Sequence, residues 1–152
     1  ARFRKWQFSA GAVAAVFHDV LIVLGIFSLS YNIMPFNMEI NQAFIAAILT
    51  VIGYSLNDTV VVFDRIREYT RNNQNEKLSQ TVNLALNSTL SRTLNTSLTT
   101  LLVLFAIFLF GGESIRGFMF ALIVGVIIGT YSSVFIATPV MFDSQKKKVI
   151  EV

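Results

Sequence analysis

The chain has 152 residues and a formal net charge of +3, and 54% of its residues are hydrophobic whereas only 14% are charged. A soluble domain of this size needs a larger charged fraction to keep its surface solvated, so the composition excludes a soluble globular protein and indicates a membrane protein. The absence of cysteine excludes disulfides, thiolate metal sites and a cysteine nucleophile.

Four apolar stretches predict an all-α membrane protein, because each is near the roughly 20 residues that a helix needs to cross a bilayer. We expect a single transmembrane domain whose spans cover residues 8–31, 42–63, 94–110 and 117–140. Since the chain begins with Ala1 rather than methionine, we also expect it to be a fragment of a larger protein.

The first span carries His18 and Asp19 near its middle. Imidazole exchanges protons near neutral pH, so His18 is a secondary candidate for a proton relay. A histidine inside a helical bundle more often serves as a hydrogen-bond partner between helices. Asp19, also a secondary candidate, is expected to point to a different face from its neighbour.

The second span contains Asp58, a carboxylate that costs about 2.5 to 3.5 kcal/mol if it faces hydrocarbon, so intramembrane acids usually pair, face the bundle interior or carry protons. Tyr54, Asp58 and Arg65 share one stripe of the helix, and Asn57 and Asp64 form a neighbouring stripe. Asp64 and Arg65 reach the interface, whereas Asp58 lies about 9 Å deeper.

The connection after the second span contains an amphipathic pattern over residues 76–90, which predicts an interfacial helix that feeds the third span. Arg92, Asn95, Thr96 and Thr99 then line one polar face of the third helix. This face and the polar stripes of the second helix begin on the same side of the membrane, so Asp58 and Arg92 are at compatible depths.

Small residues recur at every fourth position of the last span and form a groove along one face. They are Gly117, Ala121, Gly125, Gly129 and Ser133. Small residues let the backbones of membrane helices approach closely, so another helix should lie in this groove. We favour ordinary bundle packing over a surface that slides during a conformational change.

Basic residues predict the orientation, because they collect in short loops on the cytoplasmic side. Of the 12 lysines and arginines, all but Arg116 lie before the first span, between the second and third, or after the fourth. We therefore expect cytoplasmic termini, with residues 32–41 and 111–116 outside. The basic excess reflects this orientation and contact with membrane lipid, and not binding to nucleic acid.

Asp58 and Arg92 suggest a proton gate. Desolvation favours the protonated carboxyl and a nearby arginine favours the ionised form, so an arginine that moves would switch Asp58 between taking up and releasing a proton. A static structural ion pair between the two side chains is the alternative.

The sequence GYSLNDTVVVFDRIRE at residues 53–68 closely resembles the signature of the SecF family of protein-export membrane proteins, which is related to the RND transporter superfamily. Residues 17–29, 91–112 and 117–140 resemble the same family, so the resemblance covers nearly the whole chain. SecF proteins have six spans with a large periplasmic domain after the first, and this chain aligns with the final four. Whether SecD shares the polypeptide stays open.

The resemblance implies a multi-pass protein of the bacterial inner membrane that is not an enzyme and binds no cofactor or metal. It implies work with SecD beside the SecYEG channel, where the proton motive force helps to pull exported preprotein outward. Asp58 matches the intramembrane aspartate of the family and Arg92 its conduction-related arginine. Another carboxylate of the relay belongs to SecD, so this segment alone should not couple protons to work.

Three other functions are alternatives to protein export. An intramembrane protease could draw on Ser55 and His18, but the chain lacks a nucleophile turn and a second acid motif. An RND-type exporter of lipid or drug is the nearest alternative. A passive scaffold, in which Asp58 and Arg92 only lock the helices, is the other. The sequence does not indicate the exported substrates, the proton stoichiometry or the oligomeric state.

Overall fold

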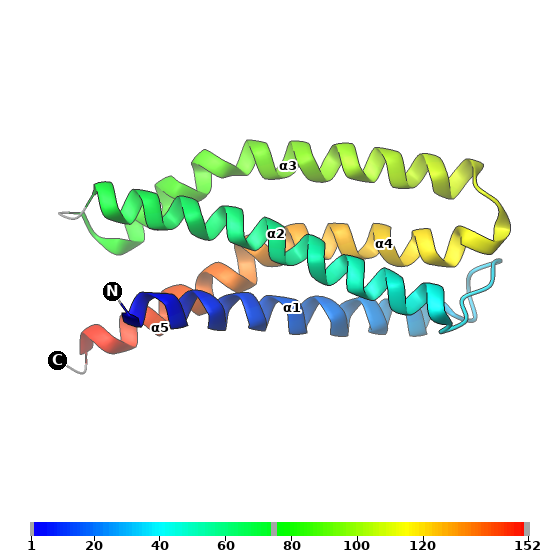
Figure 1. The fold of residues 1–152 in the computed structure, drawn as a ribbon, viewed down its shortest axis with the longest axis horizontal. Helices are drawn as coiled ribbons and strands as arrows, with labels where there is room; N and C mark the ends of the chain where they lie inside the picture. Colours follow the sequence, from blue (N-terminus) through cyan, green and yellow to red (C-terminus); the bar gives the residue numbers. More distant parts are fainter. Residues whose placement is uncertain (1, 74–75, 151–152) are drawn as a thin grey trace.

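The computed structural model describes residues 2–73 and 76–150, and only the backbone of residues 2–5 and 146–150. Its elements are α1 (Arg2–Ser30), α2 (Gln42–Asn72), α3 (Leu78–Phe110), α4 (Glu113–Ser132), the π-helix η1 (Ser133–Ala137) and α5 (Thr138–Ile150), and no strand occurs in the described residues (Figure 1).

Four segments are long and apolar enough to cross a membrane, which confirms the predicted fold class. They are Trp6–Ser30, Gln42–Asn72, Leu78–Phe110 and Glu113–Gln145. Both ends of the chain and the α2–α3 connection lie at one end of the bundle, called here the termini end (Figure 1). The basic side chains at positions 2, 4, 5 and 146–148, which were used to predict orientation, lie outside the described residues.

The helix boundaries follow from local sequence. Asn41 caps α2, because its side-chain oxygen accepts a hydrogen bond from the Phe44 N–H at 3.1 Å. Gly111 ends α3 and Gly112 precedes α4, so two glycines turn the chain between these helices. The amphipathic helix that we expected over residues 76–90 and the third span form one continuous helix, α3.

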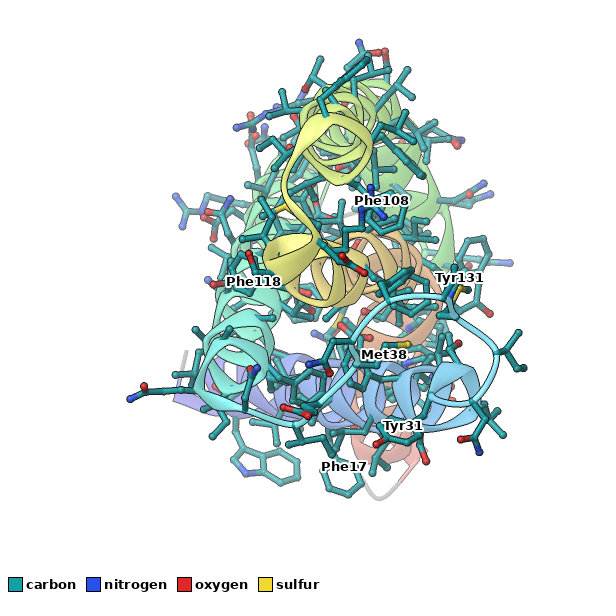
Figure 2. The ribbon with its side chains drawn as sticks, turned by 90° about the vertical axis from the view of Figure 1, so that its right-hand side faces the viewer. Phe17, Tyr31, Met38, Phe108, Phe118 and Tyr131 are labelled. Atoms are coloured by element: carbon teal, nitrogen blue, oxygen red, sulfur yellow. The ribbon has the colours of Figure 1, made fainter. Side chains whose placement is uncertain are left out.

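Helix α4 lies at the centre of the bundle. Viewed end-on, it lies between α3 and α1 with α2 along its side (Figure 2), and it contacts all three. In the segment Glu113–Gln145, which begins with α4, 50% of the apolar stretch is buried, compared with 11% in α3. Two glycines of α4 let α2 pack closely against it. A Cβ at Gly125 would overlap the Val51 side chain, and one at Gly129 would lie 3.3 Å from the Ser55 Cβ.

The last span is interrupted by a π turn, which the sequence analysis did not predict. Pro139 follows η1 by two positions. Proline has no N–H, and its ring clashes with the carbonyl four residues earlier in an α-helix, so a widened turn before it relieves the clash. The Thr138 hydroxyl then donates to the Ser133 carbonyl at 3.1 Å.

The core has three levels along the bundle axis. The termini-end cluster contains Phe8, Val62, Phe63, Ile66 and Met141. The opposite-end cluster contains Val23, Phe27, Phe44, Val51 and Met119. Between them is a polar layer to which all four spans contribute buried or half-buried polar side chains: Asp19, Ser55, Asp58, Thr59, Thr93, Ser97, Thr130, Ser132 and Ser133.

The contact between Gly125 and Val51 makes a stability prediction. Gly125→Ala should lower the free energy of unfolding by about 1 to 3 kcal/mol, because the new methyl group overpacks the α2–α4 contact. Gly25→Ala is the matched control, since a Cβ there has no heavy atom within 4 Å and alanine favours the helix. Thermal unfolding of the two variants in detergent checks this, and equal melting temperatures would contradict it.

Candidate functional site

Asp19 is at the centre of the polar layer and is only 1% exposed. Its Oδ2 accepts hydrogen bonds from Ser55 Oγ of α2 at 2.5 Å and from Ser132 Oγ of α4 at 2.7 Å. Its Oδ1 lies 3.1 Å from His18 Nδ1. A single carboxylate therefore joins α1, α2 and α4.

We expected His18 and Asp19 to point to different faces of α1, but their side chains contact each other. Adjacent side chains leave a helix about 100° apart, but the imidazole ring is long enough to reach back to the carboxylate. The His18 side chain is 30% exposed whereas that of Asp19 is 1% exposed, so the pair joins a partly accessible group to a buried one.

Asp58 is half-buried and has fewer donors than Asp19. Its Oδ2 accepts a hydrogen bond from Ser133 Oγ at 2.6 Å. The Thr93 hydroxyl and the Arg92 guanidinium of α3 lie near this carboxylate. Thr93 Oγ1 is itself buried and has no hydrogen-bond partner of standard geometry in the described part of the chain, as is also true of Thr59 Oγ1.

Arg92 is exposed on the side of α3, and among the described residues it forms no salt bridge with Asp58 or with any other acid. The structure thus brings Arg92 within electrostatic reach of Asp58 but does not show the ion pair that the sequence analysis considered. A guanidinium that is not fixed in a salt bridge is free to change its distance from the carboxylate.

Consecutive serines at the junction of α4 and η1 contact both acids. Ser132 donates to Asp19 on α1, and Ser133 donates to Asp58 on α2. Both serines are 0% exposed. From the sequence, Ser133 was expected only as a small packing residue, and Ser132 was not singled out. The run of four hydroxyl side chains at residues 130–133 was the available signal.

A chain of hydroxyls crosses the same layer. Tyr54 Oη lies 3.1 Å from Ser97 Oγ, which lies 2.6 Å from Thr130 Oγ1, and Thr130 Oγ1 donates to the Val126 carbonyl. Because each hydroxyl has one proton, Ser97 must donate to Thr130 and Tyr54 to Ser97. This series of hydrogen bonds joins α2, α3 and α4, and it uses all three hydroxyl protons.

The secondary candidates Asp64 and Arg65 lie away from Asp58, towards the termini end. Asp64 accepts from Arg67 at 3.2 Å, and Arg65 donates to Glu68 at 2.7 Å. A pocket of about 380 Å³ opens between α2 and α3 at this level. It is lined by Val61, Asp64, Arg65, Glu68, Ser88, Thr89 and Arg92.

Several polar side chains of α2 and α3 are exposed at the level of the polar layer, and we call them the exposed polar face. They are Asn57 on α2 and Arg92, Asn95, Thr96 and Thr99 on α3. Thr96 and Thr99 satisfy their hydroxyls by donating to carbonyls of their own helix. Polar groups at this depth rarely face lipid, so this face is suited to contact another protein helix.

The polar layer contains groups that are able to exchange protons. The described residues contain no group of three or more histidine, aspartate or glutamate side chains that could hold a metal ion. The layer holds carboxylates, hydroxyls and an imidazole, which bind and pass protons. Asp58 is suited to this role because it has a single hydroxyl hydrogen bond and a nearby cation.

The chain is similar to known proteins over almost its full length. A family model for "Protein export membrane protein SecD/SecF, C-terminal" matches residues 1–147. A protein translocase subunit SecF from Rhodothermus marinus is 61% identical over 91% of this chain, and one from Petrotoga mobilis is 50% identical over 95% of it. The chain spans 45% and 46% of these relatives, which is less than half of their length.

Solved structures show the same arrangement of helices. A crystal structure of SecDF in a super-membrane-facing form aligns with a TM-score of 0.85 and 41% identity over 96% of this chain and 19% of that chain. A crystal structure of SecDF from Thermus thermophilus, described as a translocon-associated membrane protein, aligns with a TM-score of 0.81 over 93% of this chain and 19% of that chain.

Proposed function

The chain belongs to the SecD/SecF family of protein-export membrane proteins, and from this membership we propose that it is the SecF-type transmembrane part of a proton-driven export motor. In this proposal it lies in the bacterial inner membrane with both termini in the cytoplasm. Together with SecD it uses the proton motive force to promote translocation of preproteins through the SecYEG channel, without a cofactor and without catalysing a reaction.

The observation that carries the proposal is the environment of Asp58. This half-buried acid accepts a hydrogen bond from Ser133 and lies near Arg92, which forms no salt bridge within the part of the chain that the structure describes. Protonation of Asp58 removes its attraction to Arg92, and release of the proton restores it. Each charge that crosses 100 mV supplies about 2.3 kcal/mol, so several protons could bias a movement of helices.

SecD is the proposed occupant of the exposed polar face on α2 and α3. Asn57, Arg92 and Asn95 would otherwise face lipid at the level of the polar layer. A SecD helix on this face would also cover the half-exposed side of Asp58, and it would bring a further carboxylate of the relay into reach. The chain by itself is then half of a motor.

Two of the alternative functions, the RND-type exporter and the passive scaffold, make different demands on Asp58. An RND-type exporter of lipid or drug would use the same proton site but a different external domain, and the names of the relatives favour protein export. A passive scaffold would need Asp58 only for assembly. The next experiment distinguishes the scaffold from the motor.

Asp58→Asn should abolish the part of preprotein export that depends on the proton gradient, because asparagine keeps the size of the side chain but cannot bind and release a proton. Full-length protein with SecD and SecYEG in liposomes provides the assay, in which completion of export is measured with and without an imposed gradient. Glu113→Gln, which neutralises an exposed acid at the far end of the bundle, is the control.

Assembly with SecD is measured in the same preparations. The motor proposal requires that assembly survives the substitution at Asp58. An Asp58→Asn protein that still responds fully to the gradient contradicts the proposed function, and one that no longer assembles supports the scaffold.

The proposed SecD contact can be tested by cross-linking, since the chain has no native cysteine. Asn57→Cys and Asn95→Cys should each cross-link to single cysteines placed in the SecD helices. Phe17→Cys should not, because Phe17 is 67% exposed on α1 and points away from the bundle on the side opposite α3 (Figure 2). Equal cross-linking from all three positions would be evidence against this contact face.

A further inference from the structure

Asp19 is the most enclosed ionisable group in the described residues, and the proposed function does not use it. We propose that Asp19 is a positioning residue for Asp58: by holding Ser132, it fixes Ser133 as the hydrogen-bond donor to the Asp58 carboxylate. The inference rests on the proposed function in one respect, namely that Asp58 is the group that exchanges protons.

The donors around Asp19 suit a fixed carboxylate. Ser55 and Ser132 both donate to Oδ2, and His18 Nδ1 lies at hydrogen-bond distance from Oδ1. Asp19 is therefore held by contacts from three side chains, whereas Asp58 accepts one hydroxyl hydrogen bond, from Ser133. The more firmly held carboxylate is suited to a positioning role.

The two acids are joined by a closed ring of contacts. Asp19 on α1 accepts from Ser132, whose neighbour Ser133 donates to Asp58 on α2. Three residues earlier on α2, Ser55 donates back to Asp19. Two of the links in this ring are covalent backbone and the other three are hydrogen bonds, so a displacement of Ser132 must change the contact between Ser133 and Asp58.

The backbone around the serine pair limits the alternatives for Ser133. Its carbonyl accepts from the Thr138 hydroxyl, and its own hydroxyl is 3.0 Å from the Thr130 carbonyl. A serine hydroxyl has only one proton, so Ser133 can donate well to Asp58 or to Thr130 but not to both. A small rotation at the junction of α4 and η1 is enough to change the acceptor, and Ser132 resists that rotation through Asp19.

A purely structural role for Asp19 makes a different prediction. In that case the loss of its hydrogen bonds would weaken the bundle in general, as would the loss of other hydroxyl contacts between helices. Ser97 provides the comparison, because it makes a 2.6 Å contact with Thr130 in the same polar layer but is not a member of the ring. If Asp19 is a positioning residue, substitutions in the ring should change the hydrogen bond to the Asp58 carboxyl, and a substitution at Ser97 should leave it unchanged.

The experiment is infrared difference spectroscopy of full-length SecF-type protein assembled with SecD in liposomes. The carboxyl C=O band that is absent in Asp58→Asn is assigned to protonated Asp58. In Asp19→Ala, which removes the acceptor of Ser132, this band should move to higher wavenumber, because a carbonyl oxygen that loses its hydroxyl donor has a stiffer bond. Ser132→Ala and Ser55→Ala should move it in the same direction, and Ser97→Ala should leave it in place.

Each outcome decides the question. An unmoved band in Asp19→Ala overturns the proposal, even if Ser132→Ala moves it, because the anchor would then not be Asp19. Equal shifts in the ring variants and in Ser97→Ala also overturn it in favour of general packing. If Asp19→Ala does not assemble, the two serine variants, which each remove a single hydroxyl, decide in its place.

Failure of the proposed function would be seen separately. If Asp58→Asn retains gradient-dependent export, Asp58 does not carry the protons that drive export. The band comparison still shows whether Asp19 sets the hydrogen bond of Asp58.

Discussion

Hydrocarbon offers no water to a buried polar group, and the arrangement of the bundle follows from this constraint. The polar side chains are gathered in one layer between two apolar clusters, where each can meet a partner from another helix. Asp19 thereby joins α1, α2 and α4, and Ser97 joins α3 to the same layer. Hydrogen bonds between membrane helices contribute only about 0.6 kcal/mol each. The layer therefore fixes the register of the helices, whereas apolar packing supplies most of the stability.

The same constraint separates the two acids. Asp19 is enclosed and accepts from two serines, whereas Asp58 is half-buried with one serine donor and an arginine nearby. The free energy of one proton crossing 100 mV, about 2.3 kcal/mol, exceeds the strength of a single hydrogen bond between helices. In the proposed motor, a driving force of this size would be enough to change the local contacts of Asp58, while the more firmly held Asp19 would keep the junction of α4 and η1 in place.

Much of the fold could be predicted from the sequence, because length and hydropathy determine which segments can span a membrane. The segment around Asp58 also identified the family. The position of Asp19 could not be predicted, since helix periodicity gives the face of a residue but not the neighbouring helix on that face. The π turn was not predicted, although Pro139 two positions after it was a signal in the sequence. The sequence predicted that Arg92 and Asp58 lie at compatible depths, but no sequence pattern shows whether two compatible charges form a salt bridge or remain apart.

The most direct test of the account is the proton flux through the full-length protein assembled with SecD in liposomes, read from a pH-sensitive dye inside the vesicles after an imposed pH jump. The account predicts a flux in the wild type that disappears in Asp58→Asn and persists in Asp58→Glu, which retains an exchangeable carboxyl group. An unchanged flux in Asp58→Asn would contradict it, because the proton would then cross the bundle without the acid on which the proposed motor depends.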